Sequence, residues 1–228
     1  MAADRIRRRA FAELLGVMEP ATWTAACEIH VHATPDDFAA AVGGPPAAAR
    51  GATSLEFAAD RISMRRIDVM GDGADIVPDA LAHEIVHVVL AERFTAAAPP
   101  RWADEGLALL FDPPKKQHDH DADFREAHRR GLTWSLEDLL ALEQYPAEVA
   151  RQRVYYGQSA ALVRWLVARR DAATFVRFIE DSAAVGTAAA LDRHYDFGSV
   201  DSLELAWKEV APIDSLGMTV RPSSLAAD

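Results

Sequence analysis

The sequence predicts an α+β fold in which a small mixed β-sheet lobe is followed by a mostly helical C-terminal lobe. Segments with the alternating pattern of strands end by residue 70, and beyond Pro78 the apolar residues recur at helical spacing. Half of the 228 residues are hydrophobic, and a chain of this length can bury a core as one domain or as two lobes. We therefore expect two lobes joined through the first long helix after Pro78.

The first 27 residues are expected to form an N-terminal helix and extension. An amphipathic pattern over residues 4–18 predicts the helix, with its aromatic and leucine residues on one side. An arginine pair within this segment faintly resembles an export signal, but Glu13, Glu19 and Pro20 interrupt the apolar stretch that such a signal needs. We therefore predict a cytoplasmic protein, with export through a non-obvious N-terminal signal as the alternative.

Residues 28–112 are expected to form an α/β lobe that carries the functional site. Alternating residues predict strands, and a threonine and proline followed by two aspartates are typical of a helix start. The predicted strand, helix, two strands and turn span, in order, 28–33, 34–42, 55–57, 62–69 and 71–73.

Residues 113–212 are expected to form the helical lobe, and 213–228 a flexible tail. Residues 115–123 are rich in potential metal ligands, but they follow two prolines, and His118 and His120 would not share a helix face. We predict an exposed polar loop there. The predicted helices from the end of the first lobe onward span 79–93, 101–111, 122–130, 135–142, 156–169, 171–182, 185–194 and 200–211.

Composition excludes several classes of function. A net charge of −11 argues against a non-specific binder of nucleic acid or of an anionic membrane, because both need a basic face. No run of eighteen apolar residues occurs, so we expect no membrane span. The single cysteine, Cys27, excludes an internal disulfide and a cysteine-rich zinc site, which leaves the eight histidines as candidates for metal chemistry.

Two of these histidines belong to an HExxH motif, His83-Glu84-Ile85-Val86-His87. Residues at i and i+4 lie on one face of a helix, so His83 and His87 can bind the same ion, and Glu84 can reach a water on that ion. The motif interrupts an otherwise apolar helix, and buried polar groups are costly unless something satisfies them. A chance match remains the alternative for the motif taken alone.

Residues 100–108 supply a third candidate ligand. Together with HExxH they resemble the gluzincin metallopeptidases of the peptidase MA-like superfamily, whose second helix carries W-x-x-E-G-[LF]-A. Seventeen residues lie between the motif and the glutamate, one fewer than is usual in gluzincin aminopeptidases, and Asp104 stands where Asn or Ser is common. The resemblance implies a zincin-like fold and one catalytic Zn²⁺ held by His83, His87 and Glu105. The matching residues are Trp102, Glu105, Gly106, Leu107 and Ala108.

Residues 156–166 are similar to a helix start of the same superfamily, Y-x-[KQ]-[GS]-x-x-L-x-x-x-L. In the aminopeptidase branch the tyrosine hydrogen-bonds the tetrahedral intermediate, a role that would fall on Tyr156. Tyr155 is the alternative, since a shift of one residue turns a helix position by about 100°. The resemblance covers most of residues 28–211.

The resemblance implies hydrolysis of peptide bonds in a peptide or protein substrate. Zinc polarises a water, Glu84 takes its proton as general base and returns it to the leaving amine, and Tyr156 helps to stabilise the oxyanion. An endopeptidase is favoured, because no segment resembles the G-x-M-E-N of aminopeptidases. By analogy with zincins, the sheet edge at 62–69 is expected to pair with the substrate. Asp112 either supports a zinc histidine or ends a helix.

Two other classes of function are weighed. One is a catalytically idle zincin-like domain that binds a partner, which has no chemical need for Glu84. The other is a regulatory protease that cleaves a specific repressor, a group whose sequences fit residues 102–108 poorly. Substrate, regulation and oligomeric state do not follow from the residues.

Overall fold

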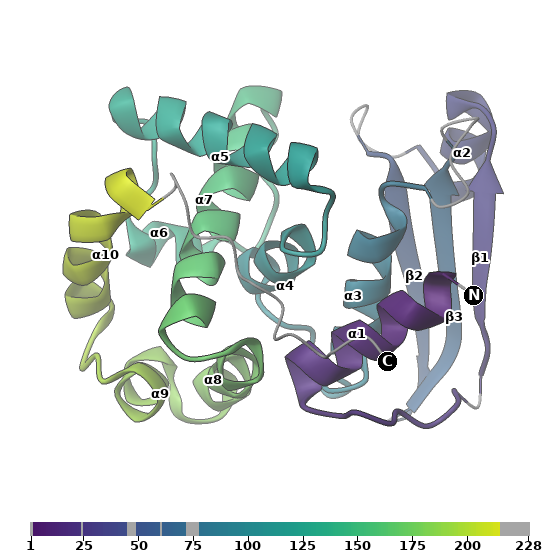
Figure 1. Ribbon diagram of the computed structural model, residues 1–228, viewed down its shortest axis with the longest axis horizontal. Coiled ribbons are helices and arrows are strands. Elements are labelled where there is room, and N and C mark those ends of the chain that lie inside the picture. The colour runs from purple at the N-terminus through teal and green to yellow at the C-terminus, as the bar shows by residue number, and fades with distance from the viewer. Residues whose placement is uncertain (1, 24, 45–48, 60, 72–77, 215–228) are drawn as a thin grey trace, which may run out of the picture.

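A computed structural model describes residues 2–23, 25–44, 49–59, 61–71 and 78–214. It has the mixed α+β class that the sequence predicts, with a three-stranded sheet beside a larger group of helices. Figure 1 shows the sheet at one end of the molecule and the helical lobe at the other, with helices α3 (Leu81–Ala91) and α4 (Arg101–Leu109) between them. The candidate site therefore lies where the two lobes meet.

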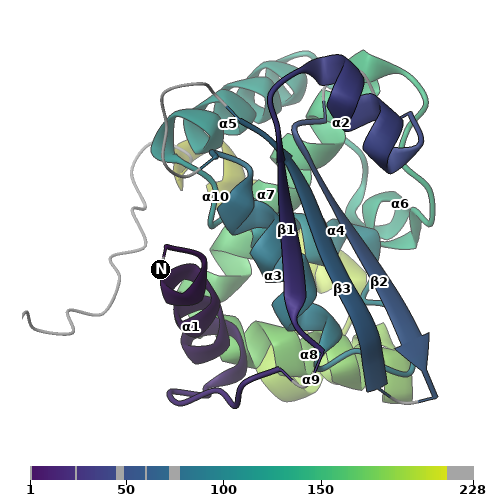
Figure 2. The same ribbon diagram turned by 90° about the vertical axis from the view of Figure 1, so that its right-hand side faces the viewer.

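The sheet contains strands β1 (Cys27–His32), β2 (Gly51–Ala58) and β3 (Arg61–Met70), in the order β1-β3-β2. β3 pairs with β1 in parallel and with β2 in antiparallel orientation. Ile67 of β3 and its partner Thr53 of β2 point to the same face, because paired residues of neighbouring strands share a side. That face packs against α3, and Figure 2 shows α3 behind the sheet.

The expectation that residues 62–69 form the edge of the sheet is wrong. β3 lies in the centre, with β1 on one side and β2 on the other, and its Ile67 and Val69 are fully buried. β3 is the most buried of the three strands, since a central strand with neighbours on both sides buries more of its surface. β2 also begins four residues earlier than predicted, because its first residues are small or polar and do not alternate.

Two helices complete the sheet lobe. α2 (Pro35–Val42) is capped by Thr34, whose hydroxyl accepts from the backbone of Asp37, and it ends at Gly43 with a left-handed φ of 77°. α1 (Ala2–Leu15) packs against α3 and also against α8 (Ala172–Val185) of the helical lobe. The N-terminal segment is therefore part of the packing between the lobes rather than a separate extension.

α4 is held close to the longest helix of the second lobe, α7 (Val149–Arg169). Gly106 makes this approach possible, because a Cβ at that position would lie 2.9 Å from the carbonyl oxygen of Ser159 and would overlap Val163. The glycine of the E-G-L-A segment is therefore needed for the close packing of α4 against α7. This packing fixes the position of α4, the helix that carries Glu105.

The remaining helices form the second lobe, and one of them contains a segment that the sequence predicts as a loop. Residues 115–123 are helical and not an exposed loop. Pro114 is the first residue of their helix, a position that suits proline, and Lys115 pairs with Asp119 one turn later. The remaining helices of the second lobe are α5 (Pro114–Arg129), α6 (Leu136–Ala141), α8 (Ala172–Val185), α9 (Thr187–Tyr195) and α10 (Val200–Asp214).

The ends of the predicted elements differ in smaller ways. α7 starts seven residues before the predicted 156, and α10 continues to Asp214, into the segment predicted as a tail. Most of that tail, residues 215–228, and most of the predicted turn at 71–73 lie outside the described residues. Within the described part of the chain, no helix combines the length and apolar character needed to cross a membrane.

Candidate metal centre

The three predicted metal ligands come together between α3 and α4. His83 and His87 lie one turn apart on α3, with ring centroids 4.8 Å from each other, and Glu105 faces them from α4. Each residue offers one donor atom, and these atoms all lie within 4.8 Å of one another. His83 and Glu105 are buried, so the donors converge in a site largely shielded from water.

His83 is held between two carboxylates. Its Nε2 lies 3.3 Å from Oε2 of Glu105, and its Nδ1 lies 3.4 Å from Oδ1 of Asp112. The Asp112 side chain is fully buried, and Nζ of Lys116 lies 2.9 Å from its other oxygen. Asp112 thus contacts a histidine of the candidate site and also lies just beyond the end of α4, so the structure is compatible with both roles that the sequence leaves open for it.

His87 has a carboxylate partner that sequence reasoning missed. Its Nδ1 lies 2.9 Å from Oδ1 of Asp104, the residue directly before Glu105. The available signal was the acidic residue at a position where the gluzincins commonly have Asn or Ser. Both histidines therefore have carboxylates at Nδ1, which leaves Nε2 of each ring as the nitrogen for a metal.

The electrostatic environment of the cluster favours a cation. Burial lowers the pKa of His83, but the neighbouring carboxylates of Asp112 and Glu105 outweigh it and raise that pKa to about 9. Burial likewise opposes the effect of Asp104 on His87, whose pKa rises to about 10. Against burial, the two histidines lower the pKa of Glu105 to about 2. Two imidazoles and one carboxylate are also the donor set of many catalytic zinc sites, so these residues fit Zn²⁺.

Glu84 is adjacent to the ligands but outside the donor cluster. It is buried, and its Oε2 accepts a hydrogen bond of 2.8 Å from the hydroxyl of Thr53 on β2. β2 passes close to it at Gly51, where a Cβ would lie 2.8 Å from Cγ of Glu84. No local signal in the sequence points to Thr53, because its contact with Glu84 depends on how the sheet packs on α3.

Three tyrosines line one side of the centre. The rings of Tyr155 and Tyr156 lie 5.9 and 6.1 Å from that of Tyr145. Burial and the charges of Glu105 and Glu84 raise the pKa of Tyr156, which lies in their field. The hydroxyl of Tyr155 is buried without a hydrogen-bond partner among the described residues.

Tyr145 makes the most direct contact, which the sequence did not predict. Its hydroxyl donates a hydrogen bond of 2.5 Å to Oε1 of Glu105. The residue lies in the connection between α6 and α7, where no periodic pattern or motif draws attention to it. Its role depends on the packing of that connection against α4.

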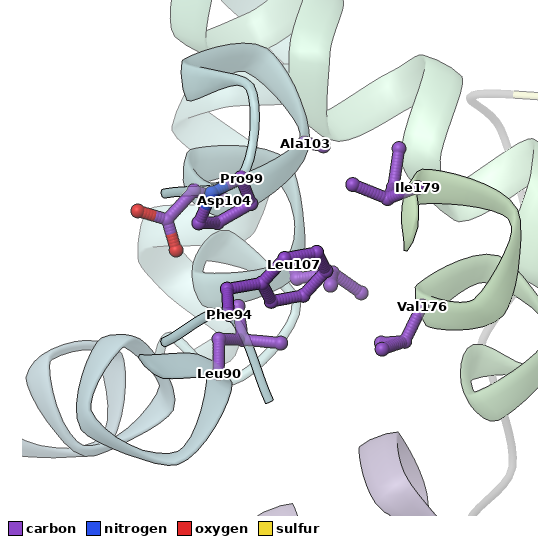
Figure 3. A pocket seen from close by; sticks show the side chains of 8 residues that line it. All are labelled: Leu90, Phe94, Pro99, Ala103, Asp104, Leu107, Val176 and Ile179. Atoms are coloured by element: carbon purple, nitrogen blue, oxygen red, sulfur yellow. The ribbon is translucent and has the colours of Figure 1, made fainter. Parts of the chain in front are cut away.

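A small apolar hollow lies at the end of α3, between α4 and α8. Figure 3 shows Asp104 at its margin, with the carboxylate turned away from the apolar side chains of Val176 and Ile179. None of the three candidate ligands lines this hollow, so it is separate from the metal centre.

Comparisons with protein-family models, with curated proteins and with solved structures find no match for this chain. The interpretation of the centre therefore depends on its residues and their geometry.

Proposed function

We propose that the protein is a zinc-dependent metallopeptidase of zincin-like architecture, and that it acts as an endopeptidase. The observation that carries the proposal is the convergence of His83, His87 and Glu105, with Glu84 buried beside them and outside the donor set. A structural zinc site has no use for that fourth polar side chain, whereas hydrolysis needs a base next to the water.

A zinc ion held by His83, His87 and Glu105 would act as a Lewis acid and lower the pKa of a water from 15.7 towards about 7. Glu84 accepts the proton of the attacking water and delivers it to the leaving amine. One water is thereby added across the peptide bond, giving a carboxylate and an amine. Thr53 donates to Oε2 of Glu84, which fixes the carboxylate and leaves Oε1 to carry the proton.

Substrate is proposed to bind along β2 rather than β3. β2 is the outer strand on the side of Glu84, and its far edge carries no partner strand among the described residues. An extended peptide that pairs with this edge would run past Glu84. Tyr156, half-buried and in the field of Glu105 and Glu84, would donate its hydroxyl to the substrate oxygen that becomes negative.

The test joins metal analysis with a peptide-substrate screen on the full chain. We expect stoichiometric zinc in protein purified without chelators, and a loss of hydrolysis of on the order of a thousandfold or more in Glu84→Gln, because that variant keeps the ligands and loses the base. Glu209→Gln, on the exposed side of α10 and away from β2, is the matched control and should keep full activity. Protein without zinc would refute the metal centre. Zinc with hydrolysis unchanged in Glu84→Gln would refute the mechanism.

A further inference from the structure

The two oxygens of the Glu105 carboxylate have different neighbours. Oε1 accepts the hydrogen bond from Tyr145, and Oε2 lies 3.3 Å from Nε2 of His83. The nitrogen that His83 offers to a metal is thus close to one oxygen of Glu105, while the other oxygen is already engaged. A neutral phenol is a donor at neutral pH, and its hydrogen bond to a carboxylate is of the stronger, charge-assisted kind.

Tyr145 is itself held in place from α4. Arg101 and Glu105 lie at i and i+4 on that helix, so both side chains point towards the same neighbouring segment. Nε of Arg101 donates to the carbonyl oxygen of Glu143 at 2.8 Å, and its guanidinium carbon lies 4.6 Å from the centre of the Tyr145 ring. The connection from α6 to α7 is therefore attached to α4 at two points one turn apart.

Two further rings lie against Tyr145, which remains 38% exposed. Tyr155 meets it nearly edge-on, with an interplanar angle of 86°, and Tyr156 lies against it at 34°. Arg101 and these two rings limit the positions that the phenol can adopt. The hydroxyl is directed at Glu105 by side chains that do not themselves belong to the donor cluster.

We propose that Tyr145 is a positioning residue for the metal centre, which engages Oε1 of Glu105 so that Oε2 alone is presented to the metal. The inference rests on the proposed zinc site. A carboxylate that presents one oxygen leaves a coordination position for water, whereas one that binds through both oxygens occupies it. Tyr145 would thereby keep the centre suited to hydrolysis without touching the substrate.

The experiment substitutes Co²⁺ for zinc in the full chain, because cobalt reports its coordination through visible absorption. Tyr145→Phe removes one hydroxyl and keeps the ring. We expect its affinity for Co²⁺, measured by competition with a chelating dye, to fall by about 10- to 100-fold, the usual effect of losing a group that orients a ligand. We also expect weaker visible absorption, because a carboxylate that binds through both oxygens raises the coordination number.

Tyr195→Phe is the matched control. Tyr195 is a buried tyrosine on α9 whose hydroxyl has no hydrogen-bond partner among the described residues. It should leave both the cobalt affinity and the spectrum unchanged. A Tyr145→Phe protein with wild-type affinity and spectrum would overturn the inference, even if its hydrolytic rate falls, since the tyrosine would then act on the substrate.

Two further variants make the result decisive. If Tyr145 acts through Glu105, then Tyr145→Phe should add no further loss of affinity in a Glu105→Ala background, and an additive loss would overturn the inference. If Tyr145→Phe does not fold, the exposed Arg101→Gln releases the same ring, and unchanged cobalt affinity and spectrum in that variant would count against the proposal. Wild-type protein that binds neither cobalt nor zinc would instead refute the proposed function itself.

Discussion

At the scale of single residues, the centre combines groups of two kinds. The first kind belongs to motifs that are recognisable in the sequence, because helical spacing fixes which residues share a face. These residues are His83, Glu84, His87 and Glu105. Their partners Asp104, Thr53 and Tyr145 are each brought in by tertiary packing. Each partner engages a specific atom of a motif residue and so decides which atom remains for chemistry.

Thr53 gives a prediction at this scale. We expect Thr53→Val to lower kcat by about tenfold with zinc content unchanged, because Glu84 loses the hydrogen bond that orients its carboxylate while the ligands stay in place. Steady-state kinetics with metal analysis would measure both quantities.

Thr53→Ser is the control for this prediction, because it keeps the hydroxyl and should retain most of the rate. Equal losses in the serine and valine variants would mean that the shape of the side chain, and not its hydrogen bond, matters.

At the scale of secondary-structure elements, the sequence predicts which segments are helical better than it predicts how those segments pack against their neighbours. Most strands and helices follow from the residues, and the predicted bounds of α3 and α4 suffice to bring the candidate ligands together, since local periodicity and capping determine these elements. The errors come from context. The proline pair at 113–114 predicts a loop, whereas Pro114 begins α5, and the sequence predicts an edge position for β3, whereas β1 and β2 enclose it. Which strands pair, and on which side, is not encoded within one strand.

The approach of α4 to α7 gives a prediction for an element. Gly106→Ala should lower the free energy of unfolding by about 1–3 kcal/mol, because the added methyl would overlap Val163 and lie 2.9 Å from the backbone oxygen of Ser159. The gain in helix propensity, about 1 kcal/mol, is already included in that range. Chemical denaturation measures the difference.

Gly198→Ala is the comparison, since a Cβ there would meet no atom within 4 Å. It should change stability little. A Gly106→Ala protein as stable as wild type would show that α4 and α7 can separate without loss.

At the scale of the whole molecule, the candidate metal centre joins the two lobes. His83 and His87 come from α3, which packs on the sheet, and Glu105 comes from α4, which packs on α7. An ion bound to all three would therefore resist the separation of the lobes. Any ligand that binds the native state alone adds to its stability by mass action.

Removal of the metal gives a prediction at this scale. At free zinc about 100-fold above Kd the expected stabilisation is about 2.7 kcal/mol, which for a chain of this size corresponds to a Tm lower by roughly 5–10 °C after chelation. Differential scanning calorimetry before and after dialysis against a chelator measures the shift. The chelator should have no effect on His87→Asn, which lacks a ligand. An unchanged Tm in zinc-depleted wild type would contradict the bridging role of the ion.

The position of α1 has a consequence for how the chain acquires its structure. α1 is synthesised before α3 and α8, yet it packs against both, and α8 begins only at Ala172. On the ribosome the apolar side of α1, with Phe11 and Leu14, has no complete binding surface until α8 has emerged. Contacts of such long sequence separation slow folding and leave apolar surface open to aggregation in the meantime. The final closure of the two lobes is therefore expected to follow synthesis, with α1 among the last helices to dock.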